Sequence, residues 1–100
     1  MKSIDERFKK IIYELMSGSW DLEEYPVFEG EYVRNEFSAG LYCDKAYEKV
    51  LLANSRLCER LGVQEDPDVE IIISNLLGIG KYLAMKMYDY GVFFSLPSIK

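Results

Sequence analysis

The sequence predicts an all-α protein built from three principal helices in one domain, residues 1–100. Three observations carry this prediction. Apolar residues recur at helical spacing in three separate segments. Capping residues or glycines bound each of these segments. The length of 100 residues leaves room for a single core, and a hydrophobic fraction of 49% with 29% charged residues is typical of a globular chain.

The first helix is predicted over residues 3–17. Ser3 followed by Glu6 forms a capping box, and Gly18 supplies the stop. The apolar side of this helix consists of Ile4, Phe8, Ile11, Ile12 and Leu15. Residues 18–30 form an acidic, aromatic connection interrupted by Pro26, which is expected to fold back over the end of the core.

The second helix is predicted over residues 31–61 as the long central element. Its apolar seam follows a heptad and consists of Cys43, Tyr47, Val50, Asn54, Leu57 and Leu61. Ser38 and Gly40 are weak helix formers, so a kink or break at residues 36–40 stays open. Asn54 either sets the pairing of two helices or bonds locally to a neighbouring backbone group.

The third helix is predicted over residues 67–90. Asp66 fits the N-cap, Pro67 fits the first helical position, and Gly91 supplies the stop. Because only residues 62–66 separate the second and third helices, these two helices should form an antiparallel hairpin within a three-helix bundle.

The third helix carries two apolar stripes on nearly opposite sides. The first is assigned to the core and consists of Val69, Ile73, Leu76, Gly80, Leu83 and Met87. Leu76 and Leu83 are therefore expected in the core, together with Val50 and Leu57 of the second helix. The opposite stripe, with two phenylalanines of the tail, is the candidate interface: Ile71, Gly78, Tyr82, Met85, Phe93 and Phe94. A homodimer would hide it, or the tail at residues 92–96 would fold back over it.

The sequence offers no catalytic, metal-binding or cofactor-binding residues to assign. It has no histidine, which removes the commonest general base and metal ligand. The segment at Gly78–Lys81 lacks the glycine and hydroxyl of a Walker motif, so Gly78 and Gly80 are interpreted as sites of close helix approach. Cys43 and Cys58 lie on or beside the apolar seam and are interpreted as buried, inert thiols.

The charge and hydropathy of the sequence argue against nucleic acid and membranes as partners. The net charge of −5 disfavours direct binding to nucleic acid, and the acidic residues concentrate in residues 21–36 and 65–70. The N-terminus is highly charged and lacks the apolar core of a secretory signal, and no uncharged run is long enough for a membrane helix. These features indicate a cytoplasmic protein that does not contact a membrane.

The segment DVEIIISNLLGIGKYLAMKMYDYG, residues 68–91, resembles parts of small uncharacterised helical proteins encoded in Firmicutes genomes and their mobile elements. The resemblance covers the third helix and its end. It implies a bacterial helical protein, contains no catalytic signature and implies no activity for individual residues.

Three functions fit the sequence. The leading hypothesis is a non-enzymatic helical protein that acts through protein–protein interaction after forming a homodimer. The alternative is an acidic inhibitor from a phage or mobile element that imitates the phosphates of nucleic acid with its two acidic segments. The third is a histidine-free enzyme that uses carboxylates.

Overall fold

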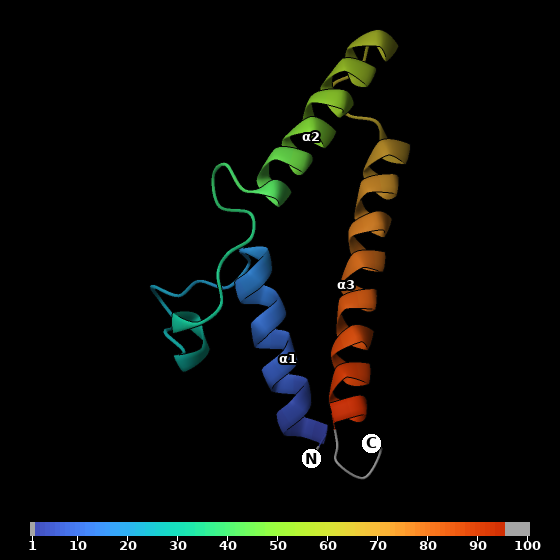
Figure 1. The fold of residues 1–100 in the computed structure, drawn as a ribbon. Helices are drawn as coiled ribbons and strands as arrows, with labels where there is room; N and C mark the ends of the chain where they lie inside the picture. Colours follow the sequence, from blue (N-terminus) through green and yellow to red (C-terminus); the bar gives the residue numbers. More distant parts are fainter. Residues whose placement is uncertain (1, 96–100) are drawn as a thin grey trace.

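The computed structural model describes residues 2–95, with side chains from residue 6 onward. Its elements are α1 (Lys2–Ser17), the short 3₁₀ helix η1 (Phe28–Glu31), α2 (Tyr42–Leu61) and α3 (Pro67–Ser95). The described part of the chain contains helices and no strand, which confirms the all-α class. Figure 1 shows α1 beside the C-terminal half of α3 and antiparallel to it, whereas α2 leads to the other end of the molecule.

Glycines end the first two helices by the same local geometry. Gly18 and Gly62 adopt the left-handed conformation, with φ of 82° and 73°. After α1, the amide of Ser19 donates to the carbonyl of Glu14 at 2.9 Å. After α2, the amide of Val63 donates to the carbonyl of Cys58 at 3.0 Å. These bonds satisfy carbonyls that the helix leaves free, so both predicted stops are confirmed.

The start of α3 is also set by local chemistry. The Oδ1 atom of Asp66 accepts hydrogen bonds from the amides of Asp68 and Val69, at 3.0 and 3.1 Å. Pro67 occupies the first helical position, where no amide proton is needed. The predicted N-cap is therefore confirmed. The side chain of Ser3, half of the proposed capping box of α1, lies outside the described residues.

Two predicted boundaries are wrong. The second helix begins at Tyr42 instead of residue 31, because Gly40 has a φ of 85° and residues 32–41 form turns. Its first turn is fixed when the amide of Gly40 donates to Oδ2 of Asp44 at 3.0 Å. The third helix runs through Gly91, which lacks a positive φ, and ends at Ser95. Phe93 and Phe94 therefore belong to α3 and do not form a separate extended tail.

The three helices leave most of their apolar surface uncovered. Among the described residues, the buried apolar side chains are Ile11, Leu15 and Cys58. The radius of gyration is 17.4 Å, compared with about 13 Å for a compact domain of this length. In Figure 1, α1 and α2 follow one another along the length of α3 and do not enclose a common core with it.

The predicted core residues of α3 are exposed. Leu76 and Leu83 have 63% and 60% of their surface exposed, and Val50 of α2 has 40%. Only Leu57 of the four is half-buried. The core assignment is wrong for Leu76 and Leu83, whereas Val69 and Ile73 of the same stripe are half-buried. Because α3 carries apolar residues around most of its circumference, periodicity could not identify the side that α1 covers.

Candidate protein-interaction surface

One side of α3 faces the rest of the chain. The half-buried side chains of α3 are Val69, Ile73, Ala84, Met85 and Tyr88. Three of these, Ala84, Met85 and Tyr88, line a hollow together with residues of α1. Farther up the helix, Ile73 and Leu77 line a groove together with Tyr47 and Leu51 of α2.

A second side of α3 is turned away from both α1 and α2. We call it the outer stripe and define it by six residues that fall within about 80° of one another around the helix: Ile72, Leu76, Ile79, Leu83, Met87 and Tyr90. Between 55% and 74% of the surface of each is exposed. Phe94, 59% exposed, continues the same stripe at the end of the helix. Sequence reasoning missed this surface because half of it had been assigned to the core.

The candidate interface predicted from sequence is divided by the structure. Ile71 and Tyr82 are exposed at 57% and 62%, on a different side of α3 from the outer stripe. Gly78 also faces open space, since a Cβ atom there would meet nothing within 4 Å. Met85, in contrast, contributes to the hollow shared with α1. Phe93 is 49% exposed on α3 itself, so residues 92–95 continue the helix and do not fold back over it, while residue 96 of that segment lies outside the described residues.

The other proposed site of close helix approach is also open. A Cβ atom at Gly80 would meet nothing within 4 Å, and the segment Gly78–Lys81 lies inside α3. No helix within residues 2–95 therefore approaches these two glycines. Their position within a helix agrees with the absence of a Walker phosphate loop, which requires a loop before the helix.

A charged pair joins α1 to α3 on the covered side. The Nζ atom of Lys9 donates to Oδ1 of Asp89 at 2.8 Å and lies 3.0 Å from Oε1 of Glu6. Only 7% of the Lys9 surface is exposed. The bond to Asp89, followed by the bond to Glu6, raises the pKa of Lys9 above 10.5. The pair therefore links α1 to α3 through a hydrogen bond between side chains of the two helices.

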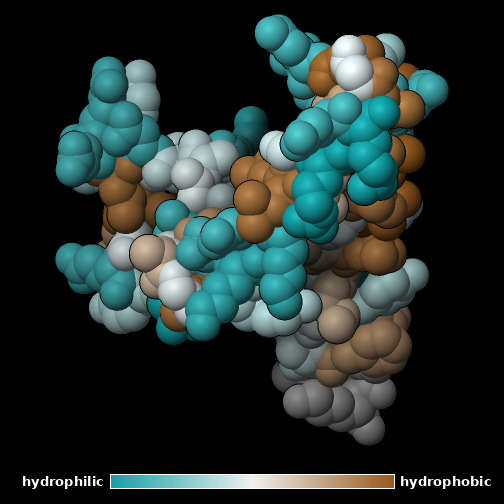
Figure 2. All heavy atoms as spheres, turned by 90° about the horizontal axis from the view of Figure 1, so that it is seen from above, coloured by the Kyte–Doolittle hydropathy of each residue, from teal (hydrophilic) through white to brown (hydrophobic). Residues whose placement is uncertain are grey.

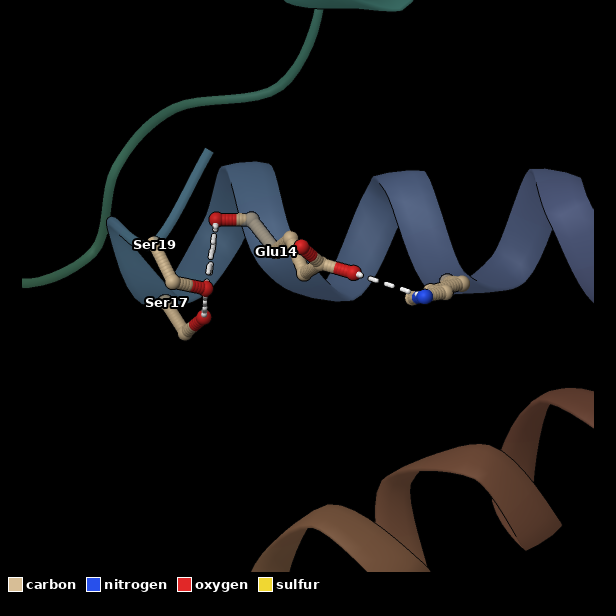
Figure 3. Close-up of polar contacts among 4 residues, drawn as sticks. Glu14, Ser17 and Ser19 are labelled. Carbon is tan, nitrogen blue, oxygen red and sulfur yellow. Dashed lines mark hydrogen bonds and ion pairs between the residues drawn. The ribbon is translucent and has the colours of Figure 1, made fainter. Parts of the chain in front are cut away.

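The end of α1 buries a carboxylate. Figure 3 shows the side chain of Glu14 directed along the helix, away from the contact between its own carbonyl and Ser19. The Oε2 atom of Glu14 is buried without a hydrogen bond and lies 4.0 Å from Nζ of Lys10. The hydroxyls of Ser17 and Ser19 are hydrogen-bonded at 3.1 Å beside it. These contacts belong to the end of α1.

The α2 side carries an open apolar hollow. It is lined by Phe37, Tyr42, Cys43, Ala46, Tyr47 and Val50. The rings of Phe37 and Tyr47 meet edge to face at 6.2 Å. Cys58, farther along α2, is buried and donates from Sγ to Oδ1 of Asn54 at 3.4 Å. The bond of Asn54 is thus local to α2, but it joins two side chains and does not involve the backbone.

The acidic connection between α1 and α2 is held by its own polar bonds. Oδ1 of Asp21 accepts from the amides of Glu23 and Glu24, at 3.1 and 3.2 Å. Arg34 pairs with Glu36 through two donors, which raises the pKa of the guanidinium. Tyr25 and Phe28 are 61% and 72% exposed, so these aromatic residues do not cover the core as expected.

Figure 2 places the apolar surface on the molecule. Hydrophobic side chains gather on the right-hand side of this view, where α2 and α3 lie. Within residues 2–95, no three histidine, cysteine, aspartate or glutamate side chains are grouped to hold a metal ion. In the same range, no helix is long and apolar enough to cross a membrane.

Comparison with known proteins adds no relative. No protein family model matches the chain, and neither the curated proteins nor the solved structures contain a match. The function is therefore inferred from the exposed apolar surfaces of α2 and α3.

Proposed function

We propose that this chain is a non-enzymatic helical protein that acts by binding another protein, and that dimerisation completes its helical bundle. The observation that supports the proposal is the exposed outer stripe of α3. Its large aliphatic and aromatic side chains are 55–74% exposed and adjoin one another along the helix. The apolar residues on the surface of an ordinary monomer are scattered singly. A continuous patch of this kind is typical of a binding surface.

The hollow of α2 supports the same proposal from a second element. Tyr42 stands 82% exposed at its rim, and aromatic residues of this kind are enriched at protein interfaces. The helices α2 and α3 run in opposite directions on either side of the connection at residues 62–66 and form an open hairpin. Another polypeptide that packed against this hairpin would complete a helical bundle.

Imitation of nucleic acid is less well supported. Glu36 is paired with Arg34 at 2.9 Å, and Asp66 is engaged in capping α3. The two acidic segments also lie apart in Figure 1, one beside α1 and the other at the start of α3. A mimic would need their charges free and on one surface to resemble a row of phosphates.

A capture experiment with three tagged proteins tests the proposed function. The wild type is compared with an apolar-surface variant, Tyr42→Glu with Val50→Glu. It is also compared with a loop variant that carries the same number of substitutions, Glu23→Lys with Glu24→Lys. Proteins retained from the native host are quantified by mass spectrometry at low and high salt.

We expect a retained protein other than the chain itself to fall at least about tenfold with the apolar-surface variant and to persist at high salt. A partner lost with the loop variant or with salt would favour the acidic mimic instead. Equal retention by all three proteins would show that the hollow of α2 does not bind the retained protein. Retention of no protein other than the chain itself would contradict the proposed function.

A further inference from the structure

The outer stripe has a symmetric spacing. Counted from Leu83, the apolar positions lie four, seven and eleven residues away in both directions along α3. Toward the N-terminus these are Ile79, Leu76 and Ile72. Toward the C-terminus these are Met87, Tyr90 and Phe94. The stripe therefore reads the same in both directions.

A symmetric stripe can pair with a reversed copy of itself. If two α3 helices pack antiparallel with a two-fold axis at Leu83, Ile79 of one copy faces Met87 of the other. Leu76 then faces Tyr90, and Ile72 faces Phe94. Each contact pairs apolar with apolar, and each occurs twice, as a two-fold interface requires.

The position of Lys86 argues for the antiparallel pairing. A parallel coiled coil needs an unbroken heptad, and continuing the heptad from Ile72, Ile79 and Leu83 places Lys86 in the seam against its own copy. In the antiparallel pairing Lys86 lies opposite Gly80, where a Cβ atom would meet nothing within 4 Å. The like charges are then kept apart.

The exposed area is large enough for a dimer. The chain exposes 8210 Å², whereas a compact monomer of 11.6 kDa is expected to expose about 5,800 Å². The excess of more than about 2,000 Å² per chain lies within the range that obligate homodimers bury. A second copy of the chain is thus sufficient to account for the open shape.

We propose that a second copy of this chain packs on the outer stripe, with the two α3 helices antiparallel and the two-fold axis at Leu83. This inference rests on the proposed function and names its first partner. It differs from the dimer surface expected from sequence, which used Ile71, Gly78 and Tyr82. In the proposed dimer those three residues lie beside the contact.

The first experiment compares two aspartate substitutions on the same helix. Leu83→Asp brings two carboxylates together at the axis, and Ile71→Asp is the matched control at 57% exposure on another side of α3. Light scattering gives the mass under reducing conditions, and circular dichroism checks the helix content. We expect a mass of twice 11.6 kDa for the wild type and for Ile71→Asp. For Leu83→Asp we expect a dissociation constant at least about 100-fold higher.

The second experiment tests the antiparallel direction by exchange of charges. Ile79→Glu and Met87→Lys should each weaken the dimer at least about tenfold, and the double variant should recover most of that loss. The matched control is Ile72→Glu with Met87→Lys, which has the same charges in positions that do not face each other. The control should not recover, because position 72 faces position 94 in this pairing.

Each outcome decides the inference. A wild-type mass of 11.6 kDa at micromolar concentration, or loss of the dimer with Ile71→Asp alone, would overturn it. Equal recovery by both double variants would overturn the antiparallel axis. These results are independent of the capture experiment, in which a monomeric chain can still retain a partner and a dimeric chain can retain none.

Discussion

The two halves of α3 differ in how much of the chain covers them. The C-terminal half lies against α1, where Ile11 and Leu15 are 3% and 4% exposed and Lys9 reaches Asp89. Along the N-terminal half, α2 meets α3 only across an open groove, and Leu77 at its edge is still 49% exposed. One continuous helix thus joins a packed region to an unpacked one.

The difference separates what the chain stabilises alone from what it leaves for a partner. The bond of Lys9 to Asp89 and the contact of the Phe8 and Tyr88 rings, 6.1 Å apart, hold α1 to α3 without help, while Ile11 and Leu15 are buried elsewhere on α1. The α2 end has its helix stop and its N-cap in place, yet it lacks apolar contact on its open side. Local chemistry therefore forms both helices of the open end, and tertiary contacts secure only one end of α3.

The largest expected effect is at the packed end. Leu15→Ala should reduce the free energy of unfolding by about 2–5 kcal/mol, because the side chain is 4% exposed and its removal leaves a cavity. Urea denaturation at a fixed protein concentration measures the loss. Leu76→Ala, at 63% exposure, is the control and should have a much smaller effect when the protein is dilute. If both variants lost the same free energy of unfolding in dilute protein, the contrast between a packed and an unpacked region would be wrong.

An intermediate effect is expected at the two helix stops. Gly18→Ala and Gly62→Ala both force alanine into the left-handed region, at about 1–2 kcal/mol each. Gly18→Ala should cost more, because its Cβ atom would lie 2.8 Å from the side chain of Asn35, whereas nothing lies near Gly62. Thermal unfolding measures both losses. If the cost at Gly18 does not fall in the background Asn35→Ala, the connection is not packed as described.

The smallest effect is the pH dependence of the charged pair. The pKa of Lys9 is raised above 10.5 by its bond to Asp89, so the pair stabilises the fold fully below that pH. The stabilisation is lost as pH rises through the raised pKa. The midpoint of urea unfolding should therefore fall more steeply above about pH 10.5 for the wild type than for Asp89→Asn. Glu6→Gln, which removes the weaker partner, should retain most of the wild-type slope.

The sequence predicts correctly those helix ends that depend on bonds between residues close together in the chain. Gly18, Gly62 and Asp66 act through bonds to residues at most five positions away, and these helix ends were located correctly. Gly91 looked like the same kind of stop, yet the helix continues to Ser95. A glycine permits the left-handed conformation without requiring it, so composition alone could not distinguish this case.

The surface required information that periodicity does not contain. Leu76 and Leu83 have the spacing of core residues, and the same spacing serves a contact between chains. Which apolar side of α3 meets α1 depends on the path of residues 18–41 between the helices. That path is set by particular bonds, such as the amide of Glu36 to the carbonyl of Met16 at 2.7 Å, and these have no sequence period.

The ammonium of Lys9 has a consequence for how α1 can slide. Apolar side chains tolerate displacement along a helix, since a neighbouring leucine or methionine can replace the original contact. A displacement of one turn would carry the Lys9 ammonium about 5 Å from the carboxylate of Asp89 and leave it paired with Glu6 of its own helix alone. The displaced helix therefore loses a charge-assisted hydrogen bond that a neighbouring apolar side chain cannot replace. The bond between Lys9 and Asp89 therefore favours one position of α1 along the axis of α3. That position determines where the connection to α2 begins.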